Sequence, residues 1–236
     1  MTETKTATIS KKPKFKLPSI VDLLQAGAHL GHKKSKWNPQ MKPFILKQRN
    51  GIHIMDVEKT LVGLADALAF IAQKRQNKQE ILFVCTKAPL NMVMAEFAHK
   101  VKMPYVTRRW LGGTLTNFKT IGKRIRDYNQ YQQKKAAGEL EKYTKKEQLT
   151  MKKDMERLEK KLDGLVTLEK IPAALFVAGL KEAKTAVREA QTMKIPVIAL
   201  CDTDAAVREI DWPIVVSDDS LGVLKLILET VKQALD

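Results

Sequence analysis

The stretch AALFVAGLKEAKTAVREAQTMKIPVIALCD, residues 173–202, decides the fold class. It holds two short apolar runs, AALFVAG and PVIALCD, separated by a polar segment whose apolar residues recur at helical spacing. Short, continuously apolar runs are typical of strands buried on both faces of a sheet. A helix between two such strands is the usual crossover of parallel strands, so the stretch predicts an α/β unit.

The same alternation extends in both directions. Upstream, we predict a helix capped by Ser19 and ended by Gly31, a loop, a strand at IHIMDV, and a helix over residues 58–75. Next come a strand at ILFVCT (81–86), a helix over 89–102 and a short strand at PYVTRRW. Downstream, a strand near WPIVVS and a helix from Ser220 close the chain. The pattern predicts a parallel, three-layer α/β sheet.

Residues 117–165 differ from the rest, because they are rich in Lys, Gln, Glu and Tyr and poor in β-branched residues. Apolar residues from Met151 to Leu165 step by four and three, which is a heptad pattern. Thr144 and Glu147 have capping-box spacing for a second helix. We therefore predict an inserted antiparallel coiled-coil hairpin at 117–165, an α/β body at 19–116 and 166–236, and a disordered basic arm at 1–18.

The chain is strongly basic. Its 236 residues include 42 Lys and Arg against 26 Asp and Glu, a formal net charge of +16. The excess lies before residue 162, since residues 162–236 hold 12 acidic and 8 basic side chains. A folded domain with such an excess repels itself unless an anionic partner neutralises it. Nucleic acid is the first candidate partner.

Several features of the sequence bear on the cellular location of the protein. Cys85 and Cys201 lie inside apolar, strand-like runs, where a thiol behaves as a small buried hydrophobe. No stretch is apolar and long enough for a signal peptide or a membrane span. An organelle transit peptide would suit the Ser, Thr and Lys of the first residues, but a basic arm explains them equally well. We expect a disulfide-free cytoplasmic protein without membrane contact.

Motifs for cofactor chemistry are absent: there is no G-x-G-x-x-G after the first strand and no P-loop. The nearest feature is the loop at Gly112 and Gly113, which joins a strand to a helix and places backbone N–H groups where an anion can bind. A tight turn that lets helix and strand pack explains the glycines equally well. The basic residues around the loop, with Trp110, favour an RNA backbone and exposed bases.

The spacing of His, Cys and Asp residues in the sequence gives little support for a catalytic or metal-binding site. His29 and His32 lie three residues apart, but a structural zinc needs four ligands and both cysteines lie on separate predicted strands. Packing or RNA contact is the preferred role for these histidines. Asp202 and Asp204 follow a strand, where α/β enzymes place carboxylates; for Asp218 or Asp219 we expect a helix N-cap. We expect no catalytic residue, no cofactor and no metal site.

Four segments carry a family resemblance: AGAHLGH (26–32), WNPQMKPFI (37–45), RWLGGTLTN (109–117) and TKKEQLTMKKDMERLEKKLDGL (144–165). With them the chain closely resembles the family of bacterial-type small-subunit ribosomal protein number two, from about Val21 to its C-terminus. The resemblance implies a flavodoxin-like or Rossmann-like body with a coiled-coil hairpin. It also implies contacts with small-subunit ribosomal RNA and neighbouring ribosomal proteins, late assembly, and recruitment of the mRNA-binding ribosomal protein number one.

From the resemblance and the local charge we assign RNA-binding residues in three groups. The N-terminal motif contributes Lys33, Lys34, Lys36, Trp37, Asn38, Lys42 and Arg49. The central motif contributes Arg108, Arg109, Trp110, Gly112, Gly113, Thr116, Asn117 and Lys119. The hairpin contributes Lys123, Arg124, Lys145 and Lys146.

The chain departs from the family at three places. Ala178 and Gly179 stand where an acidic residue is usual, Asp204 to Ala206 replace the usual Asn and a later Asp-Pro pair, and Arg108 replaces a common His. Two other functions stay open. The first is an α/β enzyme for a nucleotide or sugar phosphate, with the Gly112 loop as phosphate site and Asp202 or Asp204 as acid or base. The second is an adaptor whose hairpin binds a protein.

Overall fold

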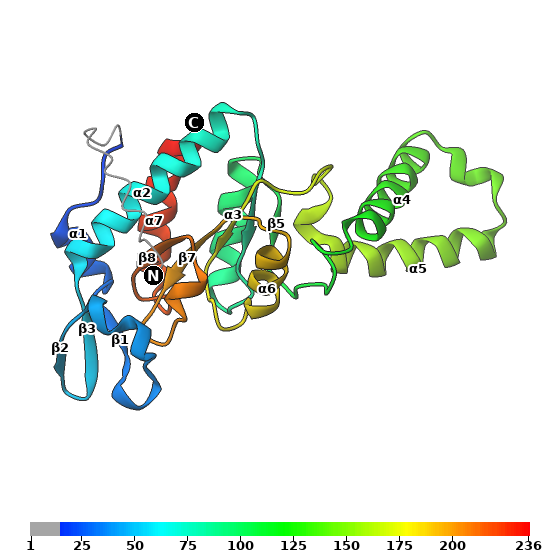
Figure 1. The fold of residues 1–236 in the computed structure, drawn as a ribbon. Coiled ribbons are helices and arrows are strands. Elements are labelled where there is room, and N and C mark those ends of the chain that lie inside the picture. The colour runs from blue at the N-terminus through cyan, green and yellow to red at the C-terminus, as the bar shows by residue number, and fades with distance from the viewer. Residues whose placement is uncertain (1–14) are drawn as a thin grey trace.

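The computed structural model describes residues 15–236 and contains a five-stranded parallel sheet, in the order β5-β4-β6-β7-β8. The strands are β4 (Ile81–Val84), β5 (Tyr105–Val106), β6 (Ala174–Val177), β7 (Val197–Cys201) and β8 (Trp212–Val215). Renumbered along the chain, this order is 2-1-3-4-5, that of the flavodoxin-like doubly wound folds. The parallel α/β prediction is confirmed, and Figure 1 shows the sheet between its helices.

Both faces of this sheet are buried, because alternate residues of each strand point to opposite sides. Phe83 and Phe176 pack on one face with the helices α2 (Val57–Gln76), α3 (Leu90–Lys100) and α7 (Leu221–Leu235). Leu82 and Leu175 pack on the other face, against α6 (Lys184–Thr192) and the base of α4 (Phe118–Ala136). The result is the three-layer body that the apolar runs predict.

Residues 117–165 form two helices outside the sheet. The helix α4 is followed by the 3₁₀ helix η3 (Glu139–Lys142) and then by α5 (Lys145–Leu162). The helices lie side by side and project from the body (Figure 1). Thr144 and Glu147 bond reciprocally at the start of α5, which confirms the capping box. Ile125 of α4 and Leu162 of α5 are buried in one cluster, so the body holds the base of this pair.

A second sheet lies near the N-terminus. Its three antiparallel strands are β1 (Leu30–Lys33), β2 (Ile45–Arg49) and β3 (Ile52–Met55), in the order β1-β3-β2. Only β3 is among the predicted strands. The hairpin between β2 and β3 turns at Asn50 and Gly51, both with positive φ, a combination that favours a tight hairpin turn. The predicted loop before β2 also contains the 3₁₀ helices η1 (Lys34–Lys36) and η2 (Pro39–Phe44).

The first helix is shorter than predicted. Ser19 caps α1 (Ile20–Ala26), as expected, and forms a capping box with Asp22. The helix ends at Gly27 and not at Gly31. Gly27 adopts the left-handed conformation, with φ of 84°, and its N–H bonds to carbonyls of the last turn. Of the predicted arm, residues 1–14 lie outside the described part. Phe15 and Leu17 pack against the body. Among residues 15–236, no helix combines the length and apolarity needed to cross a membrane.

Candidate nucleic-acid interface

The N-terminal motif is hydrogen-bonded to the segment that follows β7 of the parallel sheet. The backbone N–H of Asn38 donates to the carbonyl of Thr203, just after β7, at 2.7 Å. The side chain of Asn38 accepts from the N–H of Gln40 and caps η2. Trp37 is half-buried beside His53, with ring centroids 5.3 Å apart. The predicted cations of this motif are all exposed: Lys33, Lys34, Lys36, Lys42 and Arg49.

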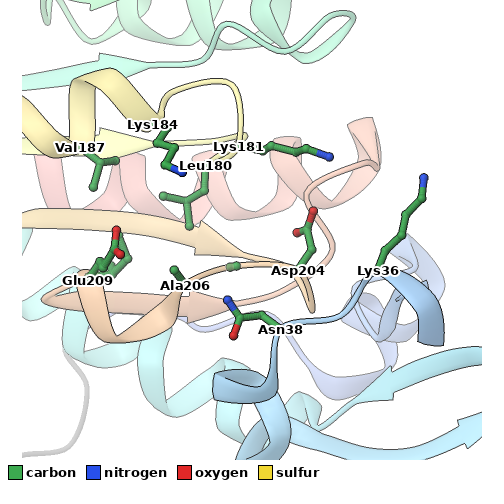
Figure 2. A pocket seen from close by; sticks show the side chains of 11 residues that line it. Lys36, Asn38, Leu180, Lys181, Lys184, Val187, Asp204, Ala206 and Glu209 are labelled. Atoms are coloured by element: carbon green, nitrogen blue, oxygen red, sulfur yellow. The ribbon is translucent and has the colours of Figure 1, made fainter.

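A cavity of about 500 Å³ adjoins this motif (Figure 2). Lys36 and Asn38 line it on one side, and Lys181, in the turn before α6, and Lys184, the first residue of α6, line it on another. The sequence alone does not mark these two lysines as part of a site, because charged residues in and beside a surface helix are ordinary. The fold therefore places two further lysines beside the predicted N-terminal motif, at a cavity that Asp204 and Glu209 also line.

The central motif is organised around a buried carboxylate. Glu189 of α6 is 8% exposed and accepts hydrogen bonds from the indole N–H of Trp110 at 2.9 Å and the backbone N–H of Gly113 at 2.9 Å. The N–H groups of Leu115, at 3.0 Å, and Thr116, at 3.3 Å, donate to its other oxygen. The predicted anion at the glycine loop is thus a carboxylate of the protein itself.

This network fixes the charge of Glu189. Burial alone would raise its pKa, but the hydrogen bonds from Trp110 and the loop backbone hold the pKa below its ordinary value. Trp110 is only 8% exposed, so its indole packs inside the protein. The phosphate site that the enzyme hypothesis places at Gly112 and Gly113 is filled by this carboxylate.

Cations surround the fixed loop. Arg108 and Arg109 precede it, and Lys119, Lys123 and Arg124 follow on the first turns of α4; all five are exposed. Gly112, Thr116 and Asn117 are also exposed, while Gly113 is half-buried. Lys145 and Lys146 are exposed at the start of α5, at the end of the helix pair away from the body (Figure 1). Most of the predicted central residues lie near the base of the pair.

The helix α6 connects the two motifs. Lys184, in its first turn, lines the cavity beside Lys36 and Asn38. Glu189, later in the same helix, holds the loop that follows Trp110. This role of Glu189 is not visible in the sequence, because a single acidic residue in a charged helix gives no sign of burial. The fold thus brings two motifs about 70 residues apart in sequence to one helix, one at its first turn and the other at its middle.

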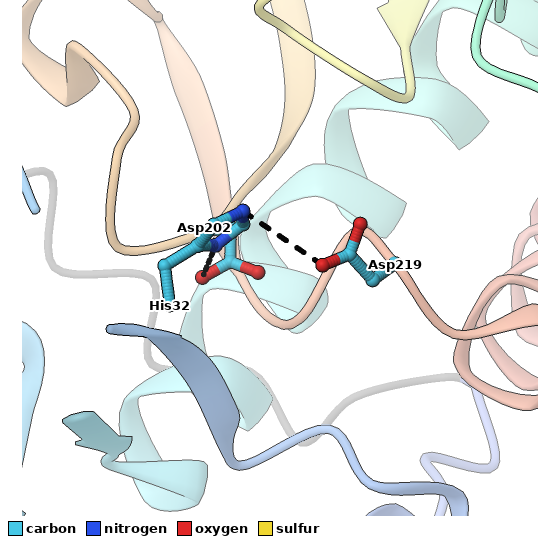
Figure 3. A group of neighbouring side chains, drawn as sticks. All are labelled: His32, Asp202 and Asp219. Atoms are coloured by element: carbon cyan, nitrogen blue, oxygen red, sulfur yellow. Dashed lines mark ion pairs between the residues drawn. The ribbon is translucent and has the colours of Figure 1, made fainter. Parts of the chain in front are cut away.

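A separate cluster of charged side chains lies where β7 and β8 end. The Nδ1 atom of His32 lies 3.2 Å from Oδ1 of Asp202, and its Nε2 atom lies 3.7 Å from Oδ2 of Asp219 (Figure 3). Lys87 places its Nζ atom 2.7 Å from Oδ1 of Asp218 and 2.7 Å from Oδ1 of Asp219. The N-cap role expected for Asp218 or Asp219 is wrong, because Ser220 caps α7 and the two carboxylates pair with Lys87.

In this cluster, burial and ion pairing shift the pKa values of His32 and Asp218 in opposite directions. Burial would lower the pKa of His32, but the nearby carboxylates, Asp202 foremost, raise it above its ordinary value. Burial raises the pKa of Asp218 to about 6, against the effect of Lys87. The hydrogen bond from Lys87 lowers the pKa of Asp219.

Lys87 also lies against Gly179, one of the departures from the family pattern. Gly179, after β6, has a φ of 77°, and a Cβ atom on it would lie 3.0 Å from Cβ of Lys87. A larger residue would therefore crowd Lys87. The space between the ends of β4 and β6, where doubly wound enzymes bind ligands, is partly filled by this lysine.

Comparison with known proteins identifies the family. The model of the family described as Ribosomal protein S2 matches residues 23–236. Proteins named small ribosomal subunit protein uS2 are similar over most of this chain. The relative from Roseiflexus sp. (strain RS-1) is 42% identical over 93% of this chain and 84% of its own length. That from Chlorobaculum tepidum is 39% identical over 90% and 85%, and that from Petrotoga mobilis 41% over 92% and 75%. These similarities show that the chain belongs to the ribosomal protein S2 family.

Proposed function

We propose that this chain is a structural component of the small ribosomal subunit that binds small-subunit ribosomal RNA. The family is one of structural ribosomal proteins and not of enzymes, and its curated relatives carry the name of a small-subunit protein. One observation supports the RNA contact most directly. Every Lys and Arg predicted to bind RNA is exposed, whereas Trp110 and the backbone of its loop bond to Glu189.

The two kinds of residue take different roles in this proposal. The exposed cations contact phosphates, which supply most of the affinity and little sequence specificity. Trp110, Gly113 and Thr116 act indirectly, because they hold the loop that carries the cations. Asn38 acts in the same way through its bond to the carbonyl of Thr203.

The two projecting helices extend the same function. We propose that α4 and α5 pack as the coiled coil that their heptads predict, and that Lys145 and Lys146 reach RNA or protein away from the body. The acidic C-terminal third faces protein or solvent in this arrangement. Participation in late subunit assembly and recruitment of the mRNA-binding ribosomal protein number one, on ribosomes of the cytoplasm, complete the proposal and rest on the family resemblance.

Charge reversal at the N-terminal motif tests the RNA contact. The double variant K34E/K36E is expected to bind cognate small-subunit RNA about ten- to a hundredfold more weakly at about 0.1 M salt, because two phosphate contacts become repulsive. Filter binding or fluorescence anisotropy of the full chain measures this. The matched control is K225E/K232E on α7, which changes the net charge equally at exposed positions. Equal losses in both variants would show that only overall charge matters and would contradict the assigned surface.

A further inference from the structure

The cavity beside the N-terminal motif combines an apolar wall with a cationic rim (Figure 2). The wall consists of buried and half-buried side chains, those of Leu180, Val187, Ala205, Ala206 and Ile210. The rim consists of exposed lysines, Lys36, Lys181 and Lys184. A cavity of about 500 Å³ with this lining is large enough for a small organic ligand and suits one with an apolar face and a negative charge.

The sides of the cavity are connected by hydrogen bonds between segments that are distant in sequence. The N-terminal motif forms one side, the start of α6 and the turn before it form the second, and the segment after β7 forms the third. The N–H of Asn38 donates to the carbonyl of Thr203 at 2.7 Å. The N–H of Arg208 donates to Oε1 of Gln40 at 3.1 Å. These bonds fix the first side to the third, so the cavity exists before a ligand binds.

The polar groups at the two ends of the cavity differ. Glu209 lies at the end away from Lys36 and Lys181 (Figure 2), and its exposed carboxylate is a hydrogen-bond acceptor. Asp204 also lines the cavity, where its carboxylate is shared with His32, whose Nε2 lies 4.0 Å from Oδ2 of Asp204. The cavity thus offers an acceptor at one end and cations at the other.

A nucleotide matches each part of this lining. Its base has apolar faces for the wall, and its phosphate is an anion for the lysines. The edge of the base carries donors for Glu209 and acceptors for Asn38, whose Nδ2 donates because its Oδ1 already accepts from the N–H of Gln40. Proteins that hold a base outside its stack use the same means, namely packing of its faces and hydrogen bonds to its edge.

We infer that the cavity binds one nucleotide unstacked from RNA, with the base against the apolar wall and the phosphate at the lysines. The inference rests on the proposed RNA-binding function and adds a base contact to the phosphate contacts. The position of the cavity favours RNA as the source. Asn38 belongs to the N-terminal motif, and Lys184 lies five residues, or about 7.5 Å of helix, before Glu189, which holds the central loop. Both cationic motifs therefore lie close to the cavity.

Titration of the full chain with adenosine 5′-monophosphate (AMP), without RNA and followed by NMR of the backbone amides, tests whether the cavity accepts a nucleotide. We expect saturable shifts of the amide signals of Leu180 and Ala206. Ribose 5-phosphate, which lacks the base, is expected to bind about tenfold more weakly.

The variant A206F places a phenyl ring in the cavity and is expected to bind AMP about tenfold more weakly than the unaltered chain, because the base loses its apolar wall. The matched control A173F places a phenyl ring at another half-buried alanine, which lines a separate hollow with Glu169 and Lys170. This control is expected to bind AMP as the unaltered chain does.

RNA binding by the same variants separates a nucleotide of RNA from a free nucleotide. A206F is expected to bind cognate small-subunit RNA about tenfold more weakly than the unaltered chain and A173F. The slope of log affinity against log salt is expected to stay unchanged, because every lysine is retained. Filter binding across a salt series measures both quantities. Unchanged RNA affinity in A206F, with AMP binding lost, would show that the cavity takes free nucleotides and would overturn the inference.

The AMP titration also stands apart from the ribosomal function. Shifts that do not saturate, or AMP affinity that is equal in A206F and the unaltered chain, would overturn the inference, and normal salt-dependent RNA binding beside that result would leave the proposed function standing. Absence of RNA binding would contradict the proposed function and, with it, RNA as the source of the nucleotide. Circular dichroism of each variant separates a lost site from a lost fold.

Discussion

Replacement of Glu189 by alanine is expected to lower the free energy of unfolding by about 3–5 kcal/mol, since buried donors that lose their acceptor each cost roughly 1 kcal/mol or more. Four N–H groups donate to this carboxylate, one from the indole of Trp110 and three from the loop backbone. No water replaces these bonds easily, because Glu189 and Trp110 are each 8% exposed. Chemical denaturation of the full chain, followed by circular dichroism, measures the loss.

The variant E189Q tests the role of the Glu189 charge through the pH dependence of stability. The pKa of Glu189 is held below its ordinary value of 4.5, so its charge stabilises the fold above the unfolded pKa. That stabilisation is lost as the pH falls through the folded pKa. E189Q is therefore expected to be less stable than the unaltered chain at pH 7, with a smaller further loss below about pH 4.5. The control E229A removes an exposed glutamate of α7. A loss in E189A no larger than in this control would contradict the role of Glu189.

Neutralisation of six exposed cations is expected to weaken binding to cognate RNA about a thousandfold at roughly 0.1 M salt, because each contact with a phosphate releases bound counterions. The variant replaces six residues by glutamine: Lys34, Lys36, Arg109, Lys119, Lys123 and Arg124. Its formal net charge falls from +16 to +10. The slope of log affinity against log salt is expected to become shallower by about four to five.

This variant is expected to lose affinity for RNA without losing stability. All six side chains are exposed, so the unfolding midpoint is expected to stay close to that of the unaltered chain. A variant that folds normally and keeps both its affinity and its salt slope would show that the phosphate contacts lie on another surface. An equal loss of affinity at all salt concentrations would instead indicate contacts other than ion pairs.

The elements of the parallel sheet were predictable because they depend on local patterns. Continuous apolar runs such as ILFVCT are buried on both faces in the structure, as their composition requires. The capping boxes at Ser19 and Thr144 were predictable for the same reason, since each depends on residues three apart. The strands β1 and β2 were not predicted. The polar, exposed β2 lacks the apolar pattern by which a strand is recognised. The Asn50-Gly51 turn was the signal that could have revealed its hairpin.

The sites were less predictable, because they join residues that are distant in sequence. Glu189 lies 76 residues from Gly113, and no local feature of α6 shows that its carboxylate faces inward. His32 meets Asp202 and Asp219 because β1 lies against the segment that follows β7, where the N–H of His32 donates to Oγ1 of Thr203. The exposed cations were predictable as a class, from charge and motif. That Lys36 and Lys184 line the same cavity could be seen only in the fold.

The central claim, that this chain is an RNA-binding component of the small ribosomal subunit, is tested most directly with small subunits that lack their own S2 protein. Binding of the full chain to these particles is measured across a salt series, with large-subunit RNA as competitor. We predict one copy bound per particle, a steep fall in affinity with salt, and little displacement by the competitor. Binding that is insensitive to salt, or equally strong to large-subunit RNA, would contradict the account.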